Sequence, residues 1–426
     1  MHGRPHQRNP RLLFVTRALR LGGTERHLAQ IAPALAKRGF DVTLYCLAKE
    51  GAQLDDLAGS GLRLAGATPL LGSASALGSA MTLATGALGL IPEMLLKQPD
   101  IAHFFLPHAF LAGSMAAAIT QVPIRIMSRR GQNHYQLKHP RLARLEHALH
   151  GSMTAILGNS QTVLDELVGQ EGVAPERAGL IYNGVDLAQF SAPVDRVGIR
   201  ASLGIGPGAT VIATLANLVP YKGHADLLRA LAAAKHRLPR AWHLLAIGRD
   251  DGALAGLQAQ TAALGLQANV QWLGSRRDVA ELLCASDIGV LASHQEGFSN
   301  AVIEGMAAGL PMVVTNVGGN AEAVRDGVTG LVVPAHDPGE LGAAIARIAC
   351  DTGAALEMGR LARQRAEREF SLDACLDRYE ALYRSLLAGN GLPRQIRSQR
   401  FAVDRTTVRM PAGTVSARYQ SSHDCV

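Results

Sequence analysis

Short apolar runs alternate with segments of helical periodicity along this chain of 426 residues, and the whole pattern occurs twice. In the first half, the runs that we expect to form strands are Leu12–Val15, Val42–Leu47, Ile101–Leu106, Ile124–Met127, Ala155–Leu157 and Leu180–Tyr182. In the second half, they are Val211–Leu215, His243–Ile247, Val270–Leu273, Ile288–Leu291, Met312–Val314 and Leu331–Val333. Such alternation favours parallel sheets covered by helices. The sequence therefore predicts an α/β protein of two doubly wound domains that face each other across a ligand-binding cleft.

A polar stretch that prolines interrupt separates the two halves. We expect an N-terminal domain over residues 1–187, a linker over 188–207 and a C-terminal domain over 208–370. A further helix is expected over 371–389. Periodicity disappears after this helix, so residues 390–426 are predicted to form a disordered basic tail.

The net charge of +7 lies at the two ends of the chain. Residues 1–11 carry +3 and residues 391–426 carry +4, so the body between them is formally neutral. Proteins that bind nucleic acid usually carry their basic excess on a folded surface among aromatic side chains, and aromatic residues are only 4% of this chain. We therefore expect no nucleic-acid partner. The basic ends suit an anionic membrane surface, and a solvated tail is the alternative.

Cysteine usage and the N-terminal sequence indicate a cytoplasmic protein. The five cysteines have no CxxC spacing, which is typical of a reducing compartment and argues against a disulfide or cysteine–zinc framework. The N-terminus lacks the apolar segment of a signal peptide. No charged residue lies between Arg63 and Glu93, and a helix over Leu77–Leu96 would pack on the first sheet or make peripheral contact with the cytoplasmic face of the inner membrane.

Two carboxylates eight residues apart, Glu296 and Glu304, mark the segment that says most about chemistry. A buried strand leads into a polar loop that carries Glu296, and Ser299 or Asn300 then opens a helix that carries Glu304. A helix N-terminus that follows a strand favours a bound phosphate. Helical spacing would separate the two carboxylates by roughly 12 Å, so we expect them to hold different parts of one long ligand. The alternative is a pair of solvated acids.

Two further strand-to-helix loops carry candidate ligand contacts. Lys222 lies between a strand and a helix, where its ammonium can offset the charge of a diphosphate. Gly22 and Gly23 occupy the first such turn of the chain, where two glycines let a phosphate or sugar approach the backbone. The alternatives are a solvated lysine and a simple tight turn.

The segments around these residues resemble the retaining glycosyltransferases of family 4. The similarity extends over residues 290–334, including the E-x7-E signature that Glu296 and Glu304 form, and over the hinge-like sequence YNGVDLAQF from Tyr182 onward. It implies a GT-B fold of two Rossmann-like domains. The N-terminal domain would bind the acceptor, the C-terminal domain would bind the nucleotide sugar, and the helix over 371–389 would cross back to the N-terminal domain.

The resemblance also implies roles for single residues. Glu296 would contact the donor sugar, Glu304 the ribose of the nucleotide, and Lys222 the donor phosphates. Lys222 and Glu296 are accordingly the candidate catalytic residues. The candidate donor-binding residues are Gly22, Gly23, Lys222, Glu296, Phe298, Ser299, Asn300 and Glu304.

One donor-side position departs from the family pattern. Asn217 stands five residues before Lys222, where the family usually has an arginine, so one of two expected positive charges is missing. Arg249, at the end of the next expected strand, is the candidate substitute.

The acceptor side departs from the pattern as well. Many members of the family have a catalytically important histidine after the strand that corresponds to Ile124–Met127, and no histidine occupies that place in this chain. Arg129 and Arg130 stand there instead, and with His108 they are the candidates for contacts with a carbohydrate or lipid-linked acceptor.

The chain has no D-x-D motif, which glycosyltransferases that depend on a divalent cation usually need. We therefore expect no metal and no other cofactor, because Lys222 and the helix start can stabilise the departing diphosphate. The predicted protein is a retaining glycosyltransferase of cell-envelope polysaccharide, lipopolysaccharide or glycolipid synthesis. The alternatives are a sugar-nucleotide epimerase on the same scaffold and a non-catalytic sugar-binding protein.

Overall fold

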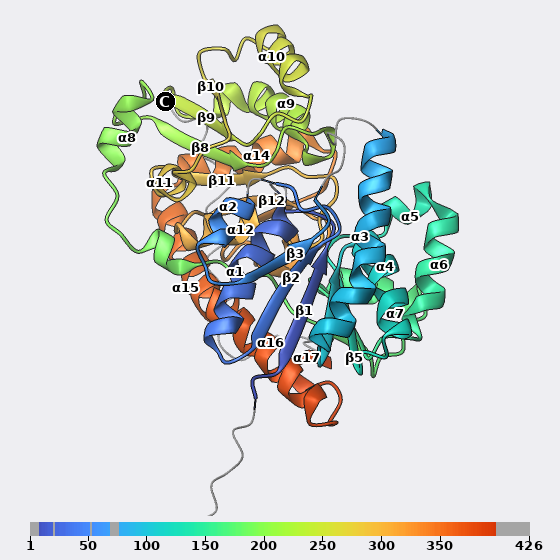
Figure 1. Ribbon diagram of the computed structural model, residues 1–426. Helices are drawn as coiled ribbons and strands as arrows, with labels where there is room; N and C mark the ends of the chain where they lie inside the picture. The colour runs from blue at the N-terminus through green and yellow to red at the C-terminus, as the bar shows by residue number, and fades with distance from the viewer. Residues whose placement is uncertain (1–7, 20–21, 52, 69–75, 398–426) are drawn as a thin grey trace, which may run out of the picture. The chain divides into compact units, whose positions relative to one another are not determined.

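The computed structural model describes residues 8–19, 22–51, 53–68 and 76–397 (Figure 1). Contacts between these residues define two compact units. Unit 1 comprises the described residues up to Gly184 and those from Leu372 onward, and unit 2 comprises Val185–Ser371.

Unit 1 contains a seven-stranded parallel sheet in the order β3-β2-β1-β4-β5-β6-β7. Its strands are β1 (Arg11–Thr16), β2 (Asp41–Cys46), β3 (Arg63–Gly66), β4 (Ile101–Phe105), β5 (Ile124–Arg129), β6 (Ala155–Gly158) and β7 (Ala178–Leu180). Its helices are α1 (Gly23–Lys37), α2 (Gln53–Ala58), α3 (Ala76–Lys97), α4 (Pro107–Ile119), α5 (His134–Lys138), α6 (Pro140–His150), α7 (Gln161–Gly169), α16 (Leu372–Leu387) and α17 (Arg394–Arg397).

Unit 2 contains a six-stranded parallel sheet in the order β10-β9-β8-β11-β12-β13. Its strands are β8 (Thr210–Leu215), β9 (Trp242–Ile247), β10 (Val270–Gly274), β11 (Ile288–Leu291), β12 (Met312–Thr315) and β13 (Gly330–Val333). Its α-helices are α8 (Arg196–Ser202), α9 (His224–Ala234), α10 (Leu254–Ala263), α11 (Val279–Cys284), α12 (Asn300–Ala307), α13 (Asn320–Ala323), α14 (Pro338–Cys350) and α15 (Thr352–Glu369). Three 3-10 helices are η1 (Leu187–Phe190), η2 (Pro220–Lys222) and η3 (Lys235–Arg237).

The two sheets share one topology. β1 pairs in parallel with β2 and β4, and β8 pairs in parallel with β9 and β11. The chain order therefore reverses beside β1 in unit 1 and beside β8 in unit 2, which is the arrangement of a doubly wound fold. The prediction of two doubly wound, Rossmann-like α/β domains is confirmed.

Burial explains which strands the sequence predicts. All five residues of β4 are buried, as the central strand of a sheet with helices on both faces requires. β3 lies at the sheet edge, and its four residues are half-buried or exposed. It therefore lacks the apolar run that marks the other strands, and it is the strand that the sequence prediction misses. β7 begins two residues before its predicted start at Leu180.

The core of unit 1 includes α16, which follows unit 2 in the sequence. Tyr379 and Tyr383 of this helix are fully buried. The Tyr379 hydroxyl lies 3.2 Å from Nε2 of His27, and the Tyr383 hydroxyl lies 2.8 Å from Nδ1 of His103. Nε2 of His103 is 2.8 Å from the Ser128 hydroxyl, so both ring nitrogens of this buried histidine have partners. His103 is thus a structural residue of the core.

The start of the predicted disordered tail differs from the expectation. Leu392 and Ile396 are buried, and α17 forms around Ile396. Ile396 contacts β7 at Gly179, where a Cβ atom would lie only 2.8 Å from the isoleucine side chain, so the glycine makes room for it. The apolar pair therefore packs into unit 1 although the surrounding sequence is polar. Residues 398–426 lie outside the described part of the chain.

Within the described residues, no helix is both long enough and apolar enough to cross a bilayer. The uncharged stretch between Arg63 and Glu93 contributes to α3, a helix of 22 residues that contacts α4 and β3.

We expect the protein to lose stability as the pH falls below about 6.5, the ordinary pKa of histidine. Burial lowers the pKa of His27 and of His103 well below that value, and the charge of Arg130 adds to the effect. The unfolded chain therefore takes up protons in this range that the folded chain does not, and each histidine costs up to about 1.4 kcal/mol of unfolding free energy per pH unit.

Urea-unfolding midpoints at about pH 7.5 and about pH 5.5 test this expectation. The midpoint should fall at the lower pH, and it should fall less in His103→Gln, whose side chain cannot take up a proton. Equal midpoints at the two pH values would contradict the assignment of His27 and His103 as buried neutral residues.

Candidate donor site at the carboxyl ends of β8 and β11

The two predicted catalytic residues follow neighbouring strands of unit 2. Lys222 lies in η2 after β8, and Glu296 lies in the loop after β11. These strands are adjacent and parallel, and the chain order reverses between them. The carboxyl ends of strands at such a reversal are where open α/β sheets bind ligands.

Close backbone packing fixes the loop that carries Lys222. Gly223 adopts φ +70° and is the N-cap residue of α9. A Cβ atom at Gly223 would come within 1.8 Å of the carbonyl oxygen of Ala292, so only glycine lets the loop rest on the end of β11. The backbone N–H of His294 also donates to the carbonyl of Tyr221, with an N–O distance of 2.7 Å. The loops after β8 and β11 are therefore joined through their backbones.

The loop that carries Glu296 is also held from the side of β12. The Thr315 hydroxyl donates to the carbonyl of Ser293 at 2.5 Å, and the backbone N–H of Gly319 donates to the carbonyl of Gly297 at 2.7 Å. Gly318 has φ +49°, and a Cβ atom there would lie 1.9 Å from the carbonyl oxygen of Glu296. This packing sets the position of the Glu296 backbone.

Lys222 and Glu296 form an ion pair, with 2.6 Å between Nζ and Oε1. The Ser293 hydroxyl donates to the same carboxylate oxygen at 2.7 Å. The side chains of Lys222 and Glu296 are 19% and 9% exposed, so the pair is poorly solvated and its charges are little screened. The sequence predicts both residues but not this contact, because nothing local links positions 74 residues apart.

The second carboxylate lies on α12, which begins at Asn300 with Ser299 as its N-cap residue. Val302 and Ile303 are buried, whereas Asn300 and Glu304 are half-buried and share one face at a spacing of four residues. Glu304 therefore lies beyond the helix start, as the sequence predicts, and on a different segment from Glu296.

Phe298 and Ser299 serve the local fold. Phe298 is buried, and its ring centroid lies 5.2 Å from that of Phe370. Ser299 is also buried, and its side chain makes no capping hydrogen bond. Any contact of these two residues with a ligand would use backbone groups at the helix start.

Arg249 lies next to Asn217, the position where the sequence lacks an expected arginine. Nε and Nη2 of Arg249 donate to the two carboxylate oxygens of Asp251 at 2.6 and 3.0 Å. The amide of Asn217 donates to Oδ2 of the same carboxylate at 3.2 Å. The guanidinium therefore reaches the vicinity of Asn217, although Asp251 offsets its charge.

In unit 1, Gly22 and Gly23 form the turn between β1 and α1. Gly22 is the N-cap residue in an extended conformation, with φ −141° and ψ 169°. A Cβ atom at Gly22 would lie 2.4 Å from the Glu25 carboxylate, so that carboxylate folds back over the helix start. Arg20 and Leu21, which precede the turn, lie outside the described residues.

Arg129 is part of a buried charge cluster. Its guanidinium donates to both carboxylate oxygens of Glu171 at 2.9 Å and to Glu146 at 3.4 Å. The three side chains are at most 6% exposed. This bidentate pairing neutralises Arg129 within unit 1, so the geometry argues against the predicted contact with an acceptor. The sequence does not predict this pairing because Glu146 lies on α6 and Glu171 follows α7, so both are far from Arg129 along the chain.

Arg130 and His108 follow β5 and β4, respectively. The Nε and Nη2 atoms of Arg130 are buried and have no hydrogen-bond partner among the described residues. Arg130 lines a cavity of about 150 Å³ at the ends of β4 and β5, together with Gln132, Tyr135 and Glu146. His108 is exposed on the first turn of α4. Arg129 lines the same cavity, but its guanidinium is already paired with two carboxylates.

Comparison with known proteins agrees with this geometry. Residues 209–351 match the family model described as glycosyl transferases group 1, and residues 21–189 match the one described as glycosyltransferase family 4.

Two curated relatives are named D-inositol 3-phosphate glycosyltransferase. The protein of Mycobacterium sp. (strain KMS) is 36% identical over 190 residues, which cover 43% of this chain and 42% of the relative. That of Saccharomonospora viridis is 33% identical over 241 residues, which cover 54% and 55%. The chain thus spans about half the length of the curated relatives it matches.

Among solved structures, Anabaena HepE in complex with UDP and glucose has a TM-score of 0.78 to this chain. The two sequences are 23% identical, and the match covers 88% of this chain and 100% of HepE. This likeness is one of fold.

Proposed function

We propose that this chain transfers a sugar from a nucleotide-diphosphate sugar to an acceptor hydroxyl. The premise is that the chain belongs to the family 4, group 1 glycosyltransferases and has their GT-B fold. The observation that carries the proposal is the contact of Lys222 with Glu296 at the strand-order reversal of unit 2. One residue of this pair suits the phosphates of the donor, and the other suits its sugar.

The donor diphosphate binds at Lys222 and at the backbone start of α12. A diphosphate has to displace Glu296 from the Lys222 ammonium, because the carboxylate holds Nζ at 2.6 Å. The helix start supplies N–H donors and the positive end of the helix dipole. Together they stabilise the leaving diphosphate without a metal, as the absence of D-x-D predicts.

The two glutamates divide the remainder of the donor. Glu296, released from Lys222, accepts hydrogen bonds from hydroxyls of the sugar. Glu304 lies further along α12 and accepts from the ribose. Transfer with retention follows if the leaving phosphate takes the proton of the acceptor hydroxyl on the face that it departs from. UDP-glucose is the first donor to test, since the structural neighbour HepE binds UDP and glucose.

Arg130 suits an anionic group on the acceptor. Arg130 lines the cavity of unit 1, and a guanidinium there can donate to a phosphate or carboxylate. The names of the curated relatives give an acceptor of this chemistry, a polyol phosphate. A carbohydrate or lipid-linked acceptor with such a group fits the predicted role in cell-envelope synthesis.

Peripheral membrane contact is a further part of the proposal. The exposed large apolar side chains of unit 1, apart from Leu387 of α16, lie on four helices, of which α3 contacts α4, α4 contacts α6, and α6 contacts α5 (Figure 1). They are Met81, Leu88, Leu95 and Leu96 on α3, Met115 and Ile119 on α4, Leu137 on α5 and Leu145 on α6. Such a face suits the interface of a membrane that holds a lipid-linked acceptor, and it would place the protein at the cytoplasmic surface.

An assay of sugar transfer tests the proposed activity. The protein is incubated in EDTA with UDP-glucose or another nucleotide sugar and with a panel of phosphorylated and lipid-linked acceptors. We expect release of the nucleotide diphosphate. We also expect a product with the anomeric configuration of the donor, as measured by proton NMR. Lys222→Ala should lower turnover by about a hundredfold, since a lost charge interaction costs roughly 3 kcal/mol of barrier. Lys235→Ala, an exposed lysine of the same unit, is the matched control.

Other results of this assay would contradict the proposal. Conversion of the nucleotide sugar to an epimer without an acceptor would indicate the epimerase. Binding without turnover of any kind would indicate the sugar-binding protein. Dependence on Mg²⁺ would contradict metal-free binding of the diphosphate, and inversion would contradict the retaining mechanism.

We expect Glu304→Gln and Glu296→Gln to separate nucleotide binding from sugar binding. Glu304→Gln should weaken binding of the free nucleotide diphosphate by about 1.5–3 kcal/mol, since it removes a charged acceptor from the ribose. Glu296→Gln should leave that binding nearly unchanged, or strengthen it by releasing Lys222, and should lower turnover. Calorimetric titration with the free diphosphate measures both effects. Equal losses in both variants would refute this division of roles.

Vesicle co-sedimentation tests the membrane contact. The protein should sediment with vesicles that contain phosphatidylglycerol, and Leu95→Ser with Leu96→Ser should reduce the bound fraction severalfold. Leu356→Ser is the control, because Leu356 of unit 2 is 71% exposed and Leu96 is 72% exposed. Equal binding of all three proteins would exclude the α3 face as the contact.

A further inference from the structure

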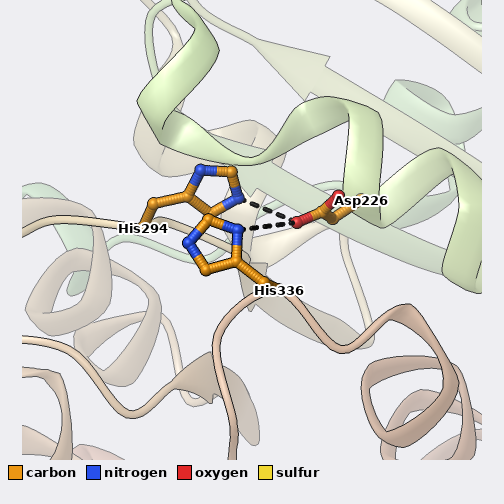
Figure 2. Close-up of side chains that lie close together, drawn as sticks. All are labelled: Asp226, His294 and His336. Carbon is orange, nitrogen blue, oxygen red and sulfur yellow. Dashed lines mark hydrogen bonds and ion pairs between the residues drawn. The ribbon is translucent and has the colours of Figure 1, made fainter.

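Three side chains that the proposed donor site does not use converge in unit 2 (Figure 2). Asp226 lies on α9, His294 lies in the loop after β11, and His336 lies in the loop after β13. One oxygen or nitrogen atom of each lies within 4.8 Å of the corresponding atoms of the other two. Three separate segments of the chain thus present donor atoms to one point.

The two imidazoles face the same oxygen of the aspartate. Oδ2 of Asp226 is 2.8 Å from Nε2 of His294 and 4.0 Å from Nδ1 of His336. The other oxygen, Oδ1, accepts a hydrogen bond from Arg229. The guanidinium thereby orients the carboxylate and leaves Oδ2 directed at the histidines, as hydrogen bonds to ligating carboxylates commonly do at metal sites.

Hydrogen bonding alone does not account for this arrangement. The 4.0 Å between His336 and Asp226 is too long for a hydrogen bond. The centroids of the two imidazole rings are only 3.8 Å apart, so both rings lie side by side against the same carboxylate. A cation bound between the three groups would contact one donor atom of each, including the His336 nitrogen that is too far from Asp226 for a hydrogen bond.

We propose that Asp226, His294 and His336 bind a divalent transition-metal ion of the Zn²⁺ type. Two imidazole nitrogens and one carboxylate oxygen are a ligand set that Zn²⁺ prefers, and hard ions such as Mg²⁺ prefer oxygen alone. A metal about 2 Å from each atom needs the ligand atoms roughly 3.4 Å apart. On metal binding, the 2.8 Å distance between His294 and Asp226 therefore lengthens, and the 4.0 Å distance between His336 and Asp226 shortens, by similar small amounts.

The solvent exposure of the three side chains is consistent with the small movements that metal binding requires. The Asp226 side chain is 8% exposed, that of His294 is 22% exposed and that of His336 is 67% exposed. His336 thus lies on a surface loop that can approach the two inner ligands, and its open side leaves room for a water molecule as the fourth ligand. The charge of Arg229 opposes the ion and moderates its affinity.

The proposed metal site adjoins the donor loops. His294 lies two residues before Glu296, and α9 begins directly after Gly223, which follows Lys222. Backbone contacts join these loops without an ion, so we expect transfer to proceed in EDTA. The site is distinct from the diphosphate, which the proposed function places at Lys222 without a metal.

Calorimetric titration of the tag-free protein with ZnCl2, with no nucleotide sugar present, tests the site. We expect one Zn²⁺ per chain, and binding at least about tenfold weaker in His336→Asn, which loses a ligand. Asparagine suits this position because His336 has φ +61°, which asparagine tolerates. His236→Asn, at an exposed histidine of the same unit, is the matched control and should bind as the wild type does.

Thermal unfolding gives a second readout. Zn²⁺ should raise the melting temperature of the wild type and of His236→Asn, because it binds the folded state, and should raise that of His336→Asn by a smaller amount at the same Zn²⁺ concentration. Circular dichroism without metal establishes that both variants fold. Equal Zn²⁺ affinity in the wild type and His336→Asn, or an equal loss in both variants, would overturn the proposal. Neither result bears on glycosyl transfer, which is measured in EDTA.

Discussion

The contact between Lys222 and Glu296 depends on how closely two backbone loops of unit 2 approach each other. Gly223 lies against the carbonyl of Ala292, and Gly318 lies against the carbonyl of Glu296. A Cβ atom at either glycine would come within 2.0 Å of a backbone oxygen, so the frame requires glycine at both positions. The backbone therefore fixes where both residues lie, and only their side chains have to separate when a ligand binds.

The same contact sets the electrostatics of the proposed donor site. Lys222 and Glu296 neutralise each other in a poorly solvated place, and a carboxylate left there without a cation would be costly. A nucleotide sugar resolves this problem when it brings both a diphosphate for the ammonium and hydroxyl donors for the carboxylate. The free diphosphate offers only the first of these. The arrangement therefore favours the intact donor over the nucleotide alone.

Much of the fold could be predicted from the sequence because most of its strands are buried on both faces. Their apolar runs mark all strands except β3, which lies half-exposed at a sheet edge. The loops of the proposed donor site could also be predicted, because glycine, lysine and the helix start at Ser299 are local features of the sequence.

Contacts between distant segments could not be predicted. The pairing of Arg129 with Glu171 and the convergence of His294 and His336 on Asp226 join residues that no periodicity relates. Leu392 and Ile396 were missed for a similar reason, because two apolar residues in a polar tail give no signal until Gly179 makes room for one of them. Tertiary packing decides such positions.

A crystal structure of the protein with an unreactive analogue of its nucleotide sugar tests the central claim most directly. The account predicts Nζ of Lys222 within about 3 Å of a diphosphate oxygen. It also predicts that the Glu296 carboxylate has turned from the ammonium to a hydroxyl of the sugar, with Glu304 at the ribose. A donor bound elsewhere, with Lys222 and Glu296 still in contact at 2.6 Å, would contradict it.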